Sequence, residues 1–304
     1  MKLKTLLFTL SFLALSGCNL PDSPPGRKTS TPPGSTTSTP PGHPGYAAAS
    51  SRKQSPFRWP PGKKAALSLT FDDARLSQAD YGLPILEVQG VKATFYVSLS
   101  ALPDRLDIWK QALAAGHEIG NHSLRHACTG NFPFSRQKAL ENYTLDQMRT
   151  EILQANREIE NLLGVRPATF AYPCGQKFVG RGPAVKSYVP LIAEHFLAGR
   201  GWFDEGPNDP AFCDFAQLLA LELDGKSFIQ LKPLLDRTIK QGGWLILVGH
   251  NIGLDGPQTT LIPTLKELCA YARDRRNGLW IDTVQTIAQY INTHRPALGK
   301  NEKP

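Results

Sequence analysis

The sequence has no apolar run long enough to cross a membrane as a helix. A spanning helix needs about 20 consecutive apolar residues, and the run at residues 6–15 is about half that length. With 304 residues, 41% of them hydrophobic, and a mean hydropathy of −0.27, the chain is not expected to be a polytopic membrane protein. This composition also excludes a wholly disordered chain and a collagen-like repeat. We therefore expect a packed core, in one large domain or two ordinary ones.

The part of the chain expected to fold has no excess of either charge. The formal net charge is +8, but nine of the 34 basic residues and only one of the 26 acidic residues precede residue 65. From residue 65 onward, 25 basic and 25 acidic residues balance. Binding to nucleic acid depends on a basic surface, so the folded part is not expected to bind it.

Residues 1–18 have the pattern of a secretory signal, with two Lys residues, an apolar run and then small residues. The segment 15–18, Leu-Ser-Gly-Cys, resembles a bacterial lipobox, which implies that Cys18 is lipidated and begins the mature protein. Asn19, where an Asp would signal retention at the inner membrane, implies the outer membrane by resemblance to Gram-negative lipoproteins. We therefore expect a lipid-anchored protein of the bacterial cell envelope. The alternative is an ordinary signal peptide with an incidental Cys.

Residues 19–64 are expected to form a disordered tether, because Pro, Gly, Ser and Thr occupy 28 of the 46 positions. Such a segment cannot bury enough apolar surface to offset the entropy of ordering, and its Pro-rich tracts favour extended conformations. The folded domain is expected at residues 65–295, followed by a short tail at 296–304.

From residue 65 the sequence alternates between short apolar or β-branched runs and helical patterns. This alternation predicts an α/β fold with a parallel sheet, open or closed into a barrel, and functional residues at the carboxyl ends of the strands. Strands are predicted at 65–71, 91–97, 118–121, 168–172, 195–198 and 244–248, and helices at 81–89, 108–115, 145–163, 263–273 and 283–292.

Two carboxylates and two histidines form the first group of candidate site residues. Asp72 and Asp73 follow the first strand directly, where adjacent like charges require a cation or separate roles. His122 and His126 are spaced i, i+4, which on a helical turn would place both imidazoles on one face. Alone, the Asp pair is also typical of a turn or a helix cap. The spacing of the two histidines alone also occurs by coincidence. Together, Asp73, His122 and His126 predict a catalytic divalent metal site with open positions for water.

Two further strand ends carry candidate groups. The segment 170–175, Phe-Ala-Tyr-Pro-Cys-Gly, has a Pro and a Gly that favour a tight loop, which can direct backbone N–H groups at a developing oxyanion. His250 follows the apolar strand 244–248. Each of these alone would be an ordinary turn or a structural histidine.

These motifs together resemble those of the NodB-type polysaccharide deacetylases, carbohydrate esterase family four, over residues 65–290. Segments 70–73, 122–126, 170–175 and 247–250 are similar to the first, second, third and fifth motifs of the family. The resemblance implies a distorted (β/α) barrel of about seven parallel strands, with residues 65–295 as the catalytic domain. It also implies the roles of the site residues: general base Asp72, general acid His250, metal ligands Asp73, His122 and His126, and an oxyanion and substrate loop of Tyr172, Pro173 and Cys174.

The activity that the resemblance implies is metal-dependent hydrolysis of acetyl groups on a polysaccharide. The substrate is expected to be an N-acetylhexosamine polymer, such as peptidoglycan, a chitin-type polymer or poly-N-acetylglucosamine, or else O-acetyl xylan. One divalent ion is expected, with zinc first and cobalt, nickel or manganese also compatible with His and Asp ligands. No protein partner is predicted. Two alternatives stay open: a hydrolase of a small linear or cyclic amide on the same fold, and a catalytically silent glycan-binding lipoprotein.

The sequence departs from the family pattern in three places. The third motif usually begins with an Arg that orients the catalytic Asp, and Ala171 stands there; we predict that Arg200, on the next strand, replaces it. Gly249 stands where a Leu is common, which predicts altered room near the acetyl group. The carboxylate of the fourth motif, which would orient His250, has four candidates: Asp204, Asp209, Asp214 and Asp224.

Four cysteines lie in the folded part, and export permits them to form disulfides. A bridge between two of Cys128, Cys174 and Cys213 is expected, with the pairing left open, and the competing interpretation of Cys128 is a metal ligand. Cys269, on an apolar helix face, is expected to be a buried free thiol.

Overall fold

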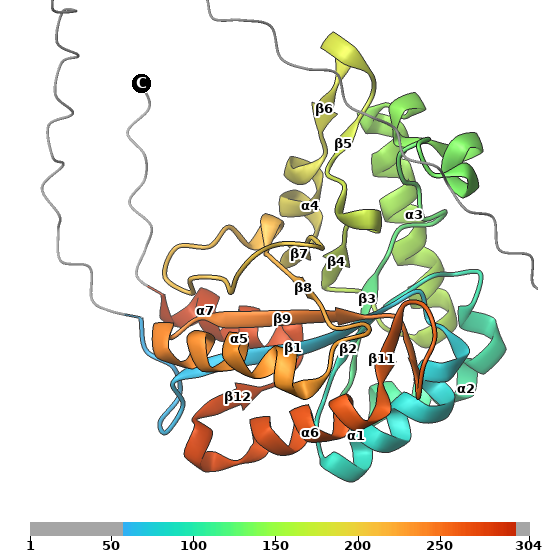
Figure 1. Cartoon of the computed structure of the whole chain (residues 1–304). Coiled ribbons are helices and arrows are strands. Elements are labelled where there is room, and N and C mark those ends of the chain that lie inside the picture. Colours follow the sequence, from blue (N-terminus) through green and yellow to red (C-terminus); the bar gives the residue numbers. More distant parts are fainter. Residues whose placement is uncertain (1–56, 296–304) are drawn as a thin grey trace, which may run out of the picture. The chain divides into compact units, whose positions relative to one another are not determined.

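The computed structural model describes residues 57–295, which form a curled parallel sheet with helices around it (Figure 1). The strand order is β7-β4-β3-β2-β1-β9-β8, and β12 pairs with the first half of β1. The strands of this sheet are β1 (Ala65–Asp72), β2 (Thr94–Val97), β3 (Glu118–Asn121), β4 (Thr169–Ala171), β7 (Ala198–Arg200), β8 (Leu221–Glu222), β9 (Trp244–Gly249) and β12 (Leu279–Ile281). The predicted α/β barrel of about seven parallel strands is therefore confirmed, with β12 as an added eighth strand.

The segment around Leu218 connects the two ends of the curled sheet. Leu218 N donates to Gly199 O at 2.9 Å, and Gly201 N donates to Leu218 O at 2.8 Å, next to strand β7. Three residues later, β8 pairs in parallel with β9 at the other end of the strand order. The barrel is thus distorted at this point, because a short irregular segment takes the place of a full strand.

The sheet buries apolar side chains on both faces. Ala65, Leu67, Leu69 and Phe71 of β1 belong to the larger core cluster, which also contains buried residues of α1, α2, α5 and α6. Ala66 belongs to a second cluster with Trp244 and with buried residues of α7. Because side chains alternate along a strand, Asp72 lies on the same face as Ala66, toward the barrel interior.

The helices are α1 (Leu83–Gln89), α2 (Leu106–Ala114), α3 (Leu145–Leu163), α4 (Val189–His195), α5 (Phe228–Gln241), α6 (Ile262–Arg273) and α7 (Val284–His294). Helix α3 has the bounds that its apolar periodicity predicts. A capping box between Thr144 and Gln147 begins it, and the left-handed Gly164 ends it. Two small pairs of strands complete the fold: the antiparallel β5 (Phe178–Val179) and β6 (Lys186–Ser187), and the parallel β10 (Asn251–Gly253) and β11 (Thr259–Leu261).

One predicted strand boundary needs correction, and one long helix was not predicted. The strand predicted at 195–198 is wrong by about three residues, because α4 continues to His195 and β7 begins at Ala198. Helix α5 had no predicted counterpart; it begins with a Ser227–Gln230 capping box and contains Pro233. Among the described residues, no helix is long and apolar enough to cross a membrane.

The folded unit also begins earlier than predicted. Residues 57–64 belong to the predicted tether, yet Phe57 and Trp59 pack against the second core cluster. The indole Nε1 of Trp59 donates to Gly242 O at 2.9 Å, and its ring stacks on Tyr290 with centroids 6.4 Å apart. Burial of two aromatic rings outweighs the Pro- and Gly-rich composition of this segment. The rest of the predicted tether, the signal segment with Cys18, and the tail from residue 296 lie outside the described residues.

Candidate active site

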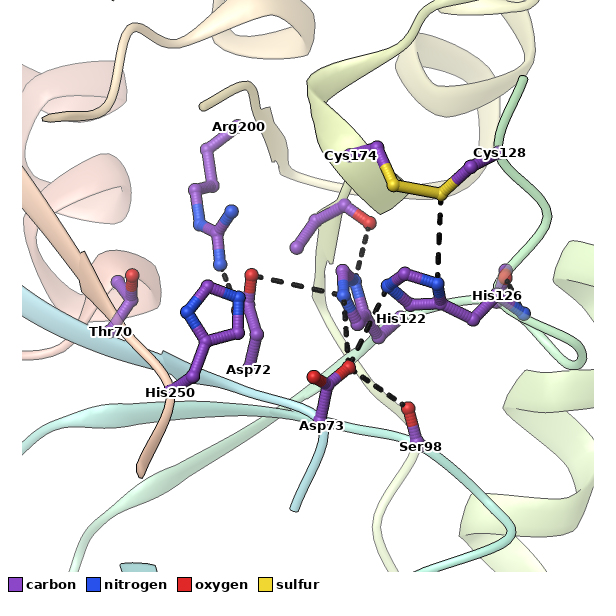
Figure 2. Close-up of polar contacts among 12 residues, drawn as sticks. Thr70, Asp72, Asp73, Ser98, His122, His126, Cys128, Cys174, Arg200 and His250 are labelled. Carbon is purple, nitrogen blue, oxygen red and sulfur yellow. Dashed lines mark hydrogen bonds and ion pairs between the residues drawn. A yellow bond between two sulfur atoms is a disulfide. The ribbon is translucent and has the colours of Figure 1, made fainter. Parts of the chain in front are cut away.

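The candidate residues converge at the carboxyl ends of the strands, around a cavity of about 480 Å³. Figure 2 shows Asp72, Asp73, His122, His126 and His250 facing one another across this site. All five line the cavity, as do Arg75, Ser98, Phe134, Lys138, Cys174, Trp202 and Gln258. The five residues come from the ends of β1, β3 and β9, so the parallel topology brings together groups that are up to 178 positions apart in the sequence.

Asp73, His122 and His126 have the geometry of a three-ligand metal site. Asp73 Oδ1 lies 3.7 Å from His122 Nε2 and 3.6 Å from His126 Nε2, and all three donor atoms lie within 4.8 Å of one another. Ligands about 2.1 Å from one tetrahedral ion are separated by about 3.4 Å, so a small inward movement would complete the coordination. The donor set therefore fits one divalent cation with at least one open position.

The two histidines meet through a loop, without the helical turn that would also place an i, i+4 pair on one face. Residues 122–126 contain no helix, and Ser123 and His126 have left-handed φ values of 62° and 51°. Asn121 Oδ1 accepts from Ser123 N at 2.7 Å, and Ser123 Oγ accepts from His126 N at 3.0 Å. These side-chain bonds stabilise the unusual backbone and bring the imidazoles together.

The surroundings of the three ligands favour their metal-binding forms. His122 Nδ1 lies 3.0 Å from Ala171 O, which assigns its proton to Nδ1 and leaves Nε2 free to coordinate. Burial and the charge of His122 lower the pKa of His126 to about 4, so this imidazole is neutral. Burial would raise the pKa of Asp73, but the neighbouring imidazoles and Arg75 outweigh it and lower the pKa to about 2.

Arg75 holds the second oxygen of Asp73. Its Nε and Nη2 donate to Asp73 Oδ2 at 3.2 and 3.0 Å, and Nη2 also donates to Gln258 Oε1 at 2.8 Å. Oδ1 of Asp73, which faces the histidines, accepts a longer bond of 3.4 Å from Ser98 Oγ. Arg75 is not among the predicted site residues, although its position two residues after Asp73 was a signal that could have identified it.

Arg200 contacts Asp72, as predicted from the missing Arg at position 171. Strand β7 pairs with β4 so that Arg200 lies opposite Ala171 in the register, and side chains at paired positions share a face. The fully buried Arg200 donates from Nη2 to Asp72 Oδ1, and its guanidinium lies 4.6 Å from the centroid of the Tyr96 ring. Asp72 Oδ2 lies 3.7 Å from His122 Nε2 and faces the metal site. Arg200 thus fixes one carboxylate oxygen and leaves the other available.

Of the four candidate aspartates, Asp224 is the one that faces His250. Its Oδ2 lies 2.7 Å from His250 Nδ1, and its Oδ1 accepts from His250 N at 3.1 Å and from Thr260 Oγ1 at 2.8 Å. Burial would lower the pKa of His250, but the hydrogen bond to Asp224 and the nearby carboxylates raise it above its usual value. Nδ1 of His250 is therefore occupied, and Nε2 is left to exchange a proton.

Gly249 makes the approach of Asp224 possible. A Cβ at this position would lie 2.1 Å from Thr260 Oγ1 and 3.2 Å from Asp224 Oδ1. The predicted effect of Gly249 on room near the acetyl group is therefore wrong, because the space above this glycine is occupied by the partners of His250.

Of the three predicted residues of the loop 172–174, Cys174 lines the cavity and the other two do not. Tyr172 is fully buried; its hydroxyl donates to Ala216 O at 2.7 Å and its N–H donates to Arg200 O at 3.0 Å, so it is a core residue. Pro173 has no N–H, which leaves the Cys174 N–H as the oxyanion donor that this loop can offer. Cys174 has a left-handed φ of 54°, and Gly175 N donates to Tyr172 O at 2.9 Å to close the turn.

A disulfide joins Cys174 to Cys128. It connects the loop 172–174 to the loop that carries His122 and His126. Cys128 Sγ lies 3.7 Å from His126 Nδ1 (Figure 2). The bridge excludes Cys128 as a thiolate metal ligand. Within residues 57–295, Cys213 and Cys269 form no disulfide, and burial raises the pKa of Cys269 to about 12, in agreement with the predicted buried thiol.

Part of this chain resembles a known protein family. Residues 59–181 match the family model described as polysaccharide deacetylase. The chain is 30% identical over 258 residues to a Bacillus gellan lyase, covering 76% of this chain and 10% of the relative. It is 31% identical over 127 residues to the peptidoglycan-N-acetylglucosamine deacetylase PgdA of Listeria monocytogenes, covering 41% of this chain and 24% of the relative. The chain therefore spans a quarter or less of the length of these curated relatives.

Solved structures share the fold. A Mycobacterium smegmatis structure that carries the polysaccharide deacetylase name superposes with a TM-score of 0.58 at 19% identity, over 82% of this chain and 98% of its own. A Pseudomonas aeruginosa structure with the same name gives a TM-score of 0.58 at 18% identity, over 79% and 95% of the two chains. The segment 59–181, which is similar to the polysaccharide deacetylase family model, contains Asp72, Asp73, His122 and His126.

Proposed function

We propose that this protein is a metal-dependent hydrolase that removes acetyl groups from a polysaccharide. The observation that carries the proposal is the arrangement within one cavity of a three-ligand metal site, an Arg-bound carboxylate, an Asp-bound histidine and a backbone donor. Acyl transfer to water needs a base, an acid, an oxyanion donor and activation of the carbonyl, and this cavity contains candidates for all of them.

Each group has a role that its surroundings support. A divalent ion held by Asp73, His122 and His126 would supply Lewis-acid activation of water and of the acetyl carbonyl. Asp72 accepts the proton of the attacking water at Oδ2, because Arg200 holds Oδ1. The Cys174 N–H donates to the developing oxyanion.

His250 protonates the leaving sugar nitrogen or oxygen from Nε2. Its raised pKa keeps the imidazole protonated at higher pH than an ordinary histidine, which suits a general acid. An amine leaves poorly unless it is protonated, so this proton matters most for an N-acetyl substrate. Zinc is the proposed ion, and cobalt, nickel and manganese accept the same ligands.

The proposed substrate is an acetylated polysaccharide of the cell envelope or its surroundings, either an N-acetylhexosamine polymer or O-acetyl xylan. The name of the Listeria relative, a peptidoglycan-N-acetylglucosamine deacetylase, supports the first class. We also propose that the protein is attached to the bacterial envelope, at the outer membrane, by a lipid on Cys18. The lipobox-like sequence at 15–18 supports this location, and a surface anchor suits an enzyme that acts on an insoluble polymer.

Acetate release from a panel of polymers tests the proposed function. The metal-loaded protein is incubated with chitin oligosaccharides, peptidoglycan, poly-N-acetylglucosamine and acetylated xylan, with Asp72→Asn as the matched inactive control. Release from one polymer by the unmodified protein alone identifies the substrate and the bond, amide or ester. No release from any of them, with metal demonstrably bound, would favour a small-amide substrate or a glycan-binding protein without activity.

A further inference from the structure

A second cavity, of about 410 Å³, lies beside the disulfide that borders the active site. Its walls come from the loop after Cys128 and from the segment after Cys174, and they include Thr129, Glu141, Gly175, Gln176, Lys177 and Phe178. We call it the Phe178 pocket. Its volume is within the range of small-ligand sites, and none of the roles assigned above uses these residues.

The Phe178 pocket is next to the active-site cavity. Cys174 lines the active-site cavity, and the next two residues, Gly175 and Gln176, line the Phe178 pocket. A Cβ on Gly175 would lie 3.1 Å from the backbone N and O of Trp202, which also lines the active-site cavity. The segment 174–176 therefore borders both cavities.

The two walls of the Phe178 pocket are fixed to each other. Gln176 Oε1 accepts from Thr129 N at 2.7 Å, across the disulfide-bridged loops. Glu141 accepts from Thr129 Oγ1 and from Gly130 N, the latter at 2.9 Å. A pocket whose walls are already held by hydrogen bonds binds a ligand with little loss of conformational entropy.

The groups in the Phe178 pocket suit a sugar ring. Phe178 leaves 58% of its surface exposed on the short β5–β6 hairpin, so its ring offers an apolar face. The hydrogen bonds at Glu141 and Gln176 leave further carboxylate lone pairs and the Gln176 amide N–H₂ for hydroxyl groups. Lys177 forms no ion pair with any residue between 57 and 295. A pyranose has an apolar C–H face and an edge of hydroxyl groups. An aromatic face beside a few fixed polar groups complements both.

We propose that the Phe178 pocket is a subsite for a sugar residue that neighbours the residue being deacetylated. This inference rests on the proposed function, and it adds that the enzyme recognises a segment of polymer and not an isolated acetylated sugar. Phe178 stacks on the ring, and Glu141 and Gln176 hydrogen-bond its hydroxyl groups. The pocket then determines the preference for chain length.

The first test is the dependence of kcat/KM on chain length, with Phe178→Ala compared with the control Phe212→Ala. Phe212 is also an exposed phenylalanine, and it lines neither cavity. With N-acetylglucosamine oligomers and acetylated xylo-oligosaccharides of one to six units, Phe178→Ala is expected to lose about tenfold on longer chains and little on the monomer. Hydrolysis of 4-nitrophenyl acetate, which is too small to reach the pocket, should stay unchanged in both variants. An identical length profile in Phe178→Ala and Phe212→Ala would overturn the proposal.

A binding measurement separates the subsite from the proposed function. In an Asp72→Asn background, the Kd for the same six-unit oligomers is measured by calorimetry with and without Phe178→Ala. A rise in Kd of about tenfold, equal to about 1.4 kcal/mol, supports the subsite even if no acetate is released by the unmodified enzyme. Equal Kd values in the two variants, or no binding of either oligomer class, would contradict the subsite whether or not the enzyme deacetylates another substrate.

Discussion

Arg200→Ala is expected to remove most of the catalytic rate while the metal site stays loaded. Arg200 is fully buried and donates to Asp72 Oδ1, so the substitution frees the carboxylate that we propose takes the proton of water. A hydrogen bond between charged groups contributes about 1.5–3 kcal/mol. Since about 1.4 kcal/mol corresponds to a tenfold change in rate, kcat should fall by about 10- to 150-fold if the whole contribution acts in the transition state.

The same substitution also affects stability, and the design must separate the two effects. Removing one partner of a buried ion pair costs about 3–5 kcal/mol, because the other charge stays buried without compensation. The assay therefore combines kcat with the thermal midpoint and with the metal content of the purified variant. Arg200→Lys keeps the charge but not the planar donor group, and it should show an intermediate loss of kcat.

A second-site variant makes the prediction specific to this position. Ala171 lies opposite Arg200 in the β4–β7 register and is fully buried, so an arginine there would extend into the space that Arg200→Ala leaves. The double variant Arg200→Ala/Ala171→Arg should recover part of the lost kcat. Unchanged turnover in Arg200→Ala, with metal and fold intact, would refute the orienting role of Arg200.

Three further predictions concern groups around the site. Asp224→Asn removes the partner that raises the pKa of His250. Because His250 must be protonated to act as the acid, the alkaline limb of the kcat/KM profile should move to lower pH. An unmoved limb would exclude this pairing. Cys128→Ala/Cys174→Ala opens a bridge between residues 46 apart, which should lower the free energy of unfolding by about 4 kcal/mol on the loop-entropy estimate; a denaturant titration that gives no loss would exclude the bridge. Gly249→Ala would place a Cβ 2.1 Å from Thr260 Oγ1, so stability should fall by about 1–3 kcal/mol, and an unchanged thermal midpoint would show that Thr260 can move at no cost.

Some elements could be predicted from the sequence because their determinants are local. Helix α3 depends on its apolar periodicity, its capping box and Gly164, all within one segment, and its predicted bounds match. Asp72 and Asp73 could be placed at a strand end because an apolar run precedes them directly. The contact of Arg200 with Asp72 could be anticipated because the resemblance implied an arginine at position 171, where Ala171 stands.

Other features depend on contacts between distant segments and had no local signal. The left-handed backbone at Ser123 and His126 depends on hydrogen bonds that the side chains of Asn121 and Ser123 accept, so the i, i+4 spacing alone did not show how the two histidines meet. Asp224 could not be chosen from four aspartates, because only the approach of β9 brings His250 to it. Trp59 lies in a Pro-rich segment, and its partner Gly242 is 183 residues away.

The most direct test of the proposed mechanism is acetate release as a function of bound metal, with His126→Ala as the matched variant. The apoprotein is titrated with zinc, and acetate from the substrate found in the polymer panel is followed together with the metal content. We expect activity to rise from near zero to a plateau at one ion per chain, and His126→Ala to need far more zinc to reach it. Full activity in the chelated protein, or a plateau that is indifferent to His126, would contradict catalysis at the Asp73, His122 and His126 site.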